Sequence, residues 1–231
     1  MNELYQERAR LYDLIYHWKD YAAEAQRVRS ILLDEGVADG GRVVEAACGT
    51  GSYLGPLSRW YGAEGYDLHA GMVQEAVSKG LRASVADMRE HRFKADAIVC
   101  LFSSIGYIAP EDLPRVAACW YGSLPEGGVA LVEPWIAPEL AESGHMNTHT
   151  YDSEELKLVR AAVHLREGRV SVLDFHWLVL RPGGIEHFVD AHRLHLSAPE
   201  ELMAPFVEAG FEARFEEAGL MPGRGLLILR R

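Results

Sequence analysis

A glycine turn beside an apolar run is the first feature of the sequence with the character of a ligand site. Gly49-Thr50-Gly51 follows residues 42–47, which are expected to form a strand, and precedes residues 53–61, which are expected to form a helix. Glycine has no Cβ atom, so the backbone there can turn tightly and approach a ligand closely. The third glycine of a dinucleotide motif would fall at Leu54, so a pyrophosphate fits less well than a smaller ligand. A plain tight turn is the alternative interpretation.

Three carboxylates stand at the ends of the first three expected strands. Glu45 lies just before the turn and could hold the amino end of an amino-acid-like ligand, or organise the loop. Asp67 ends the second strand, where an acid can bond ribose hydroxyls or remain a solvated loop residue. Asp87 could accept from an adenine amino group while Met88 covers the ring, or it could cap a helix. The three acids together indicate a site more strongly than any one of them.

The elements around these residues alternate between strand and helix. Strands are expected at residues 42–47, 63–67, 83–87, 95–102 and 129–133, and helices at 5–33, 53–61, 72–79 and 111–124. This alternation predicts a parallel sheet with right-handed crossovers. Residues 147–196 then have the pattern of three or four strands, with a hairpin turn at Arg181-Pro182-Gly183.

The C-terminal elements complete the expected sheet. A helix at residues 199–209 precedes two strands at 211–217 and 226–230, whose connection is too short for a parallel crossover, so they should pair antiparallel. The whole pattern predicts an α/β fold. It is a doubly wound, seven-stranded, mostly parallel sheet with an antiparallel last strand, plus a small antiparallel β insert.

The overall composition limits the partners and the compartment. The chain has 231 residues and a formal net charge of −11, which argues against a general nucleic-acid binder because phosphate contacts need clustered Lys and Arg. Three scattered cysteines are too few for a disulfide framework or a zinc site, so no metal is expected. No segment approaches the roughly 20 apolar residues of a membrane span, and the N-terminus has no apolar signal region. We expect a cytoplasmic protein with no nucleic-acid or membrane partner, and the sequence leaves a homodimer open.

Several longer motifs carry a family resemblance. They are Leu11-Tyr12-Asp13-Leu14, residues 19–24, Ala47-Cys48-Gly49-Thr50-Gly51, residues 102–107, Val132-Glu133-Pro134-Trp135, residues 187–192 and Gly223-Arg224-Gly225-Leu226. With these motifs the chain resembles the class I S-adenosylmethionine-dependent methyltransferases, which have a Rossmann-like fold. It is most similar to the N,N-dimethyltransferases of TDP-amino-sugar biosynthesis, of the desosamine and mycaminose type. Residues 16–18 and 144–155 depart from that pattern.

The resemblance implies a domain layout and a set of binding residues. Residues 1–136 and 197–231 would form the methyltransferase domain, with a helical lid at 1–35, and residues 137–196 would form an acceptor-side cap. The residues expected to bind S-adenosylmethionine are Tyr12, Tyr21, Glu45, Ala47, Gly49, Thr50, Gly51, Asp67, Met72, Asp87, Met88, Leu101, Phe102 and Ser103. Those expected to bind a small-molecule acceptor are Tyr5, Tyr107, Trp135, His176 and Arg224, with Arg224 a candidate for a diphosphate.

The implied reaction is methylation of an amine on an amino sugar nucleotide or a similar small molecule. An attacking amine must be neutral, so a tyrosine or histidine could take its proton. The candidates are Tyr12 and the pair His176 and His187, which lie on either side of the hairpin turn. An O-methyltransferase of another small metabolite and a non-catalytic S-adenosylmethionine-binding module are the alternatives. A nicotinamide-dependent oxidoreductase is disfavoured by Leu54 and by the last two strands.

Overall fold

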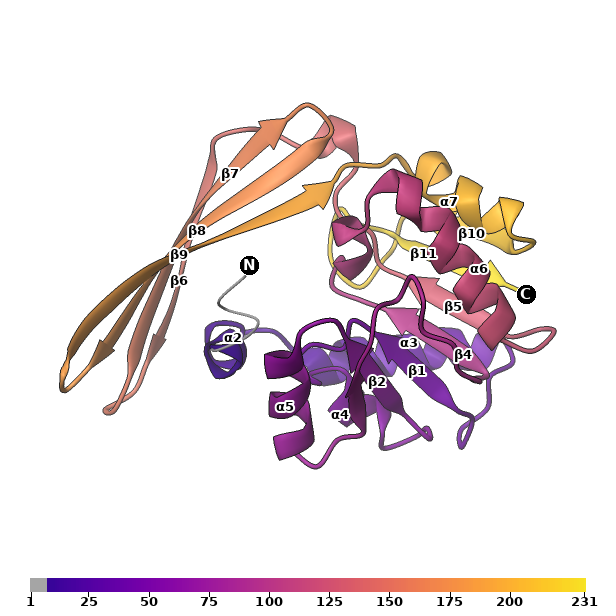
Figure 1. Cartoon of the computed structure of the whole chain (residues 1–231), viewed down its shortest axis with the longest axis horizontal. Coiled ribbons are helices and arrows are strands. Elements are labelled where there is room, and N and C mark those ends of the chain that lie inside the picture. The colour runs from indigo at the N-terminus through magenta and orange to yellow at the C-terminus, as the bar shows by residue number, and fades with distance from the viewer. Residues whose placement is uncertain (1–7) are drawn as a thin grey trace.

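The computed structural model describes residues 8–231, in which the chain forms two separate sheets (Figure 1). The strands of the larger sheet are β1 Val43–Ala46, β2 Glu64–Asp67, β3 Ala83–Val85, β4 Ala97–Cys100, β5 Val129–Val132, β10 Glu212–Glu216 and β11 Leu226–Arg230. Their order is β10-β11-β5-β4-β1-β2-β3, and β11 is antiparallel to both of its neighbours. The predicted α/β fold is therefore confirmed. The strand order reverses between β1 and β4, and ligands bind beyond the carboxyl ends of the strands at such a point.

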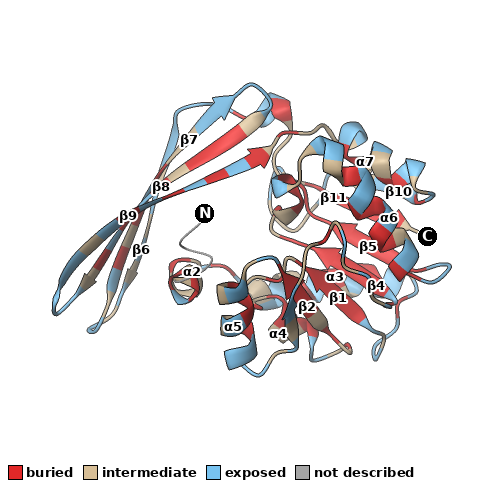
Figure 2. Cartoon of the chain, viewed as in Figure 1, coloured by how far each residue is buried: buried red, intermediate tan, exposed pale blue. Residues whose placement is uncertain are grey.

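Helices cover both faces of this sheet and bury its central strands along their whole length. Residues of β1, β4 and β5 are buried throughout, as Figure 2 shows. One face packs against α6 Leu113–Ser123 and α7 Pro199–Glu208, and the other against α3 Tyr21–Asp34 and α4 Leu54–Leu57. A further helix, α5 Ala70–Ser78, follows β2 and leads into β3.

The insert is a four-stranded antiparallel sheet that extends away from the larger one (Figure 1). Its strands are β6 His145–Asp152, β7 Lys157–Glu167, β8 Val170–Arg181 and β9 Gly184–His195, paired in sequence order. Arg181 pairs with Gly184, which confirms the hairpin turn expected there. Side chains alternate between the two faces, so Phe175 and Trp177 are buried while His176 and Leu178 are exposed. The buried face packs against helix α2 Ala9–Ile15 through Leu11 and Ile15.

Two predicted helices are shorter in the structure. The helical segment expected at residues 5–33 is divided over the described residues into two helices, because α2 ends at Ile15 and α3 begins at Tyr21. The Asp20 side chain accepts a hydrogen bond from the Ala23 backbone N–H at 2.9 Å and so starts a new helix. The helix expected at 53–61 is limited to α4, a single turn that itself contains the weak helix formers Gly55 and Pro56. Among residues 8–231, no helix is both long and apolar enough to cross a membrane.

Candidate active site

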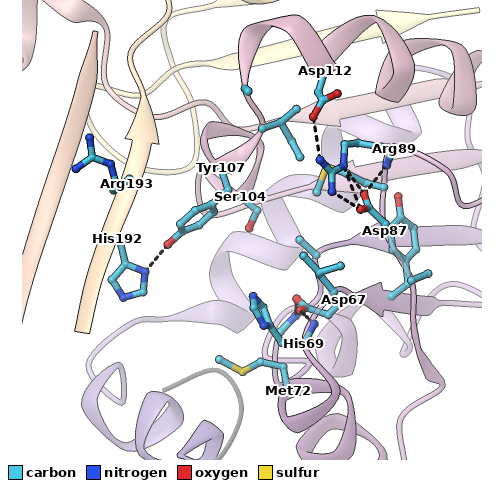
Figure 3. A pocket seen from close by; sticks show the side chains of 18 of the residues that line it. Asp67, His69, Met72, Asp87, Arg89, Ser104, Tyr107, Asp112, His192 and Arg193 are labelled. Carbon is cyan, nitrogen blue, oxygen red and sulfur yellow. Dashed lines mark hydrogen bonds and ion pairs between the residues drawn. The ribbon is translucent and has the colours of Figure 1, made fainter. Parts of the chain in front are cut away.

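A cavity of about 520 Å³ lies at the carboxyl ends of β1, β2 and β3 (Figure 3). Loops that follow these strands, the 3-10 helix η1 Ser104–Tyr107 and part of β9 form its walls. The cavity brings together seven of the residues predicted to bind the cofactor: Tyr12, Ala47, Gly49, Asp67, Met72, Asp87 and Met88. Residues far apart in sequence thus meet at the carboxyl ends of the strands, where ligands bind in sheets of this topology.

The glycine turn has a backbone that only small residues accept easily. Gly49 and Gly51 have φ angles of 54° and 82°, in the left-handed region. A Cβ atom on Gly51 would lie 2.3 Å from Cδ1 of Leu81, whereas one on Gly49 would meet nothing within 4 Å. Ala47 also has a positive φ, of 55°, which is a strained conformation for a residue with a side chain. The open space at Gly49, a residue that lines the cavity, leaves room for a ligand to approach the backbone.

Asp67 connects the turn to the end of β2. Its Oδ2 accepts a hydrogen bond from the Gly49 N–H at 3.0 Å, and its Oδ1 accepts one from the His69 N–H at 2.8 Å. Burial raises the pKa of this carboxyl group above its ordinary value, although the two backbone hydrogen bonds oppose that shift. Asp67 is therefore a preorganised acceptor on the cavity wall, in the position predicted for ribose hydroxyls.

Asp87 lies further along the cavity wall and is already paired. Arg89 forms an ion pair with Asp87 at 2.5 Å and a second one with Asp112 at 2.8 Å (Figure 3). The hydrogen bonds from Arg89 hold the pKa of Asp87 below its ordinary value, so this carboxylate is ionised at neutral pH. Met88 lies beside it on the same wall. The sequence did not suggest Arg89, because only the folded loop brings its guanidinium back over Asp87.

Five residues predicted to bind the cofactor line neither this cavity nor the one described next: Tyr21, Glu45, Thr50, Gly51 and Leu101. Glu45 is buried behind the turn, with no hydrogen-bond partner for Oε2 within residues 8–231. Burial above all, and then Asp67, raises its pKa well above the ordinary value. Thr50 donates to Asp13 of α2 at 2.5 Å, and Lys79 pairs with the same aspartate. These contacts fix α2 to the glycine turn.

A second cavity of about 220 Å³ lies between the larger sheet and the insert. It is lined by α2, the α2–α3 connection, the loop after β4 and the buried face of the insert. Phe102, Ser103, Trp135 and Arg224, four of the predicted binding residues, belong to its wall. The residues that line both cavities are Tyr12, Ser104, Tyr107 and His192. The two cavities therefore meet at these four side chains.

The backbone where the cavities meet is held in a strained conformation. Phe102 and Ser103 have φ angles of 53° and 64°, which side-chain-bearing residues rarely adopt. The Phe102 N–H donates to Oε2 of Glu133 at 2.6 Å, and Ser103 Oγ donates to the carbonyl of Pro134 at 2.7 Å. Glu133 is fully buried, and burial raises its pKa while the charge of Arg224 acts against the shift. The end of β5 thus fixes the loop after β4.

Two arginines make the second cavity basic. The Arg224 guanidinium lies over Trp135, at 4.7 Å from the ring centroid, and over Phe102 at 5.2 Å. Arg160 donates to Tyr16 Oη at 2.8 Å and lies 4.4 Å from the ring centroid of Phe175. Arg160 Nε and Arg224 Nη1 are buried without a hydrogen-bond partner among residues 8–231. Unsatisfied guanidinium donors in a cavity favour an anionic ligand.

The two segments that depart from the family pattern meet beside this cavity. The Trp18 and His149 rings stack at 5.3 Å with an interplanar angle of 13°, and both residues line the cavity. His17 contacts Tyr151 edge to face at 5.5 Å. The α2–α3 connection and β6 thus form a part of the cavity wall whose sequence differs from the family pattern.

The two predicted histidines of the insert lie away from both cavities. His176 Nδ1 and His187 Nε2 are 3.2 Å apart, as expected from the hairpin, but both side chains are exposed on the outer face of the insert. Neither lines either of these two cavities, because strand alternation directs them away from α2. Tyr5 lies outside the described residues. Within residues 8–231, no three His, Cys, Asp or Glu side chains form a candidate metal site.

His192 is a further site residue that was not among the predicted binding or catalytic residues. It is buried on the inner face of β9 together with Asp190, two residues earlier. The signal was available, because an acid and a histidine two residues apart on a strand share one face. Only the structure, however, tells which of the insert's histidines point inward.

Comparisons with known proteins agree with this geometry. Residues 43–128 match the family described as a methyltransferase domain. The chain is 32% identical to dTDP-3-amino-3,4,6-trideoxy-alpha-D-glucopyranose N,N-dimethyltransferase of Streptomyces venezuelae, over 96% of this chain and 97% of that protein. It is 31% identical to dTDP-3-amino-3,6-dideoxy-alpha-D-glucopyranose N,N-dimethyltransferase of Streptomyces fradiae, over 95% of this chain and 89% of that protein.

Solved structures extend the likeness to the whole fold. The crystal structure of DesVI from Streptomyces venezuelae matches with a TM-score of 0.89 at 32% identity, covering 97% of this chain and 98% of that one. The structure of CalS10 with S-adenosylmethionine bound, an amino pentose methyltransferase from Micromonospora echinaspora, matches with a TM-score of 0.85 at 28% identity and covers 96% of each chain. The predicted methyl donor is thereby confirmed. The chain belongs to the class I S-adenosylmethionine-dependent methyltransferases, in the family of the TDP-amino-sugar N,N-dimethyltransferases.

Proposed function

We propose that this enzyme methylates the amino group of a nucleotide-linked amino sugar. The observation that carries the proposal is the junction of two cavities at Tyr12, Ser104, Tyr107 and His192. A methyl transfer needs the donor carbon and the attacking atom in line and close together. Two adjoining cavities that share a wall meet this requirement, with the donor in the larger cavity and the acceptor in the smaller one.

The residues of the larger cavity fit S-adenosylmethionine. Asp67 would accept from the ribose hydroxyls, Asp87 and Met88 would border the adenine, and the open backbone at Gly49 would face the methionine part. When bound, the donor supplies a methyl group on a sulfonium sulfur, which needs no further activation. The task of the protein is then to orient the acceptor and to manage its proton.

The smaller cavity fits an anionic acceptor. Arg160 and Arg224 carry buried guanidinium donors with no partner inside residues 8–231, and a diphosphate would satisfy them. The two named Streptomyces relatives act, by their names, on dTDP-linked amino sugars. We accordingly propose that residues 137–196 cap the acceptor side of a methyltransferase domain made of 1–136 and 197–231, with 1–35 as its lid.

The alternatives differ in their demands on the second cavity. A non-catalytic module that only binds S-adenosylmethionine needs no acceptor cavity, so the presence of one beside the donor site disfavours it. An O-methyltransferase could use the same two cavities. Only an experiment with different acceptors distinguishes O-methylation from N-methylation.

A matched pair of acceptors tests the proposal. We would incubate the enzyme with labelled donor and either a dTDP-linked 3-amino sugar or the same nucleotide sugar carrying a hydroxyl at that carbon. We expect label only on the amine, and mass spectrometry will count the methyl groups transferred. Label on the hydroxyl compound alone would contradict N-methylation. Calorimetry with NAD serves as the control for cofactor class, with no binding expected.

We also propose a homodimer formed through the outer face of the insert. Met146, Leu165, Leu178, Ile185 and Val189 lie on this face, and each is 40% to 74% exposed. An exposed apolar patch on one face of a sheet is typical of a protein interface. Light scattering should give twice the chain mass, and Leu178→Glu combined with Val189→Glu should give the monomer. A monomeric wild type would contradict the dimer.

We place the enzyme in the cytoplasm. Its three cysteines, Cys48, Cys100 and Cys119, are buried free thiols. A reducing compartment maintains thiols in this state. Fractionation of the producing cells tests this location.

A further inference from the structure

A chain of short hydrogen bonds joins the inner face of the insert to the junction of the two cavities. Asp190 Oδ2 and His192 Nε2 are 2.7 Å apart, and His192 Nδ1 is 2.7 Å from Tyr107 Oη. Figure 3 shows the second of these bonds, with His192 of β9 facing Tyr107 of η1 across the cavity. A carboxylate, an imidazole and a phenol thus connect the insert to η1, which follows β4 of the larger sheet.

The bonding pattern assigns the protons of this chain. Asp190 and His192 are 4% and 3% exposed, and the Phe175 ring packs 5.0 Å from the imidazole. The Asp190 carboxylate can only accept, so His192 Nε2 carries the hydrogen and Nδ1 offers a lone pair. The Tyr107 hydroxyl then donates to Nδ1. The Tyr107 oxygen, which lines both cavities, therefore stands between His192 and the junction of the cavities.

These hydrogen-bonded residues lie next to the place where the acceptor nitrogen must lose a proton. Tyr107 and His192 are two of the four residues that line both cavities, so they border the place where the attacking nitrogen must lie. Tyr12, which also lines both, is not a suitable base, because burial raises the pKa of its phenol well above the ordinary value and keeps it protonated. His176 and His187 are on the opposite face of the insert.

We propose that Tyr107, His192 and Asp190 form a relay that removes a proton from the acceptor for each methyl group transferred. The inference rests on the proposed N-methylation. The bound ammonium gives one proton to Tyr107 Oη while the Tyr107 hydroxyl proton moves to His192 Nδ1, leaving a neutral amine and an imidazolium that Asp190 stabilises. The amine lone pair then forms the N–C bond as the C–S bond breaks, and the sulfonium becomes a neutral thioether.

The relay resets between transfers. The methylated product is an ammonium ion and still holds one N–H proton more than a neutral amine. The imidazolium passes its proton back through Tyr107 to water when the acceptor cavity opens. The same sequence of two proton shifts can then neutralise the methylated amine for a second transfer. One proton leaves for each methyl group gained.

Three substitutions with one matched control test the relay. His192→Asn keeps a polar group beside Tyr107 but cannot hold the proton, Asp190→Asn removes the stabilising charge, and Tyr107→Phe removes one oxygen. We expect each to lower kcat for the amino sugar nucleotide by about 10²-fold, the usual contribution of a general base. The KM for the acceptor and the Kd for S-adenosylmethionine should stay within about threefold of wild type. His187→Asn, on the outer face of the same strand, should leave kcat unchanged.

Chemical rescue separates proton transfer from a purely structural role. Imidazole added to a His192→Gly variant should restore kcat at least tenfold, and it should not affect Tyr107→Phe. A His192→Asn or Tyr107→Phe enzyme with kcat within about threefold of wild type would overturn the relay, even if the other variant is unstable. A wild type that methylates only hydroxyl groups would contradict the proposed function instead. The same variants on that acceptor would still decide the relay, because an alcohol also loses one proton per methyl group.

Discussion

The donor cavity and the acceptor cavity are built on different principles. The donor cavity is formed mainly by loops at the ends of consecutive parallel strands, and its key contacts run between backbone N–H groups and Asp67. The acceptor cavity is enclosed by α2, one short loop and the inner face of the insert, which form a separate apolar cluster around Trp177. The first depends on the topology of one sheet, and the second depends on the docking of two parts of the chain.

The largest expected effect tests whether these two regions are stabilised separately. Trp177 in the insert and Trp120 in α6 are both fully buried, so replacing either by Ala should cost about 3–5 kcal/mol of unfolding free energy. We expect Trp177→Ala to abolish acceptor binding while S-adenosylmethionine still binds below the melting temperature. Thermal unfolding with and without the donor measures this. Equal loss of donor affinity in the two variants would show that the regions are coupled.

Arg224→Ala should raise the KM for the acceptor and leave the affinity for the methyl donor unchanged. Losing a charged donor to an anionic group costs about 1.5–3 kcal/mol, so the acceptor KM should rise by about 10- to 150-fold. Arg214→Ala, which removes a surface ion pair with Glu35, is the matched control and should change neither ligand. Steady-state kinetics with both substrates varied measures the effect. Unchanged turnover of a nucleotide sugar would remove Arg224 from the diphosphate site.

Asp67→Ala should lower the affinity for the methyl donor and leave the affinity for the acceptor unchanged. The lost hydrogen bonds should weaken S-adenosylmethionine binding by about 1–3 kcal/mol, measured by calorimetry. The exposed Asp152→Ala on the insert is the control, with no change expected. If donor affinity stayed the same, Asp67 would not belong to the donor site.

Glu45→Gln should have the smallest effect on stability at low pH, where Glu45 is protonated, and its effect should appear only as the pH rises. Burial raises the pKa of Glu45 above 4.5, so the folded protein holds a proton that the unfolded chain releases. Its contribution to stability is complete below about pH 4.5 and is lost as pH rises toward the folded-state value, by at most about 1.4 kcal/mol per pH unit. The melting temperature of Glu45→Gln relative to wild type should therefore increase between about pH 5 and pH 8. A constant difference would mean that Glu45 is ionised in the fold.

The donor side could be predicted from sequence because its signals are local. Gly49, Asp67 and Asp87 each stand at a strand end, and the parallel topology brings such ends to one edge of the sheet. The sequence pattern could not predict which side chains at that edge face the cavity and which do not. Glu45 lies on the strand and points into the protein, while Arg89 pairs with Asp87 and shapes the cavity from outside the motif.

The acceptor side could be predicted only in part, because it depends on which face of each strand is turned inward. His176 and His192 are similar in sequence context, yet one is exposed and the other is buried against Phe175. A strand pattern fixes the alternation of side chains but not the face that α2 will cover. The break at Tyr16–Asp20, which lets α2 dock on the insert, follows from the cap at Asp20.

The shared wall also has an evolutionary consequence. A substitution at Tyr12, Ser104, Tyr107 or His192 changes the surroundings of both ligands at once, so selection acts on these positions twice. Trp18 and His149 border the acceptor cavity alone, and they can vary without disturbing the methyl donor. We expect descendants of this enzyme to acquire new acceptors first through the wall that α2–α3 and β6 share, and last through the four residues at the junction.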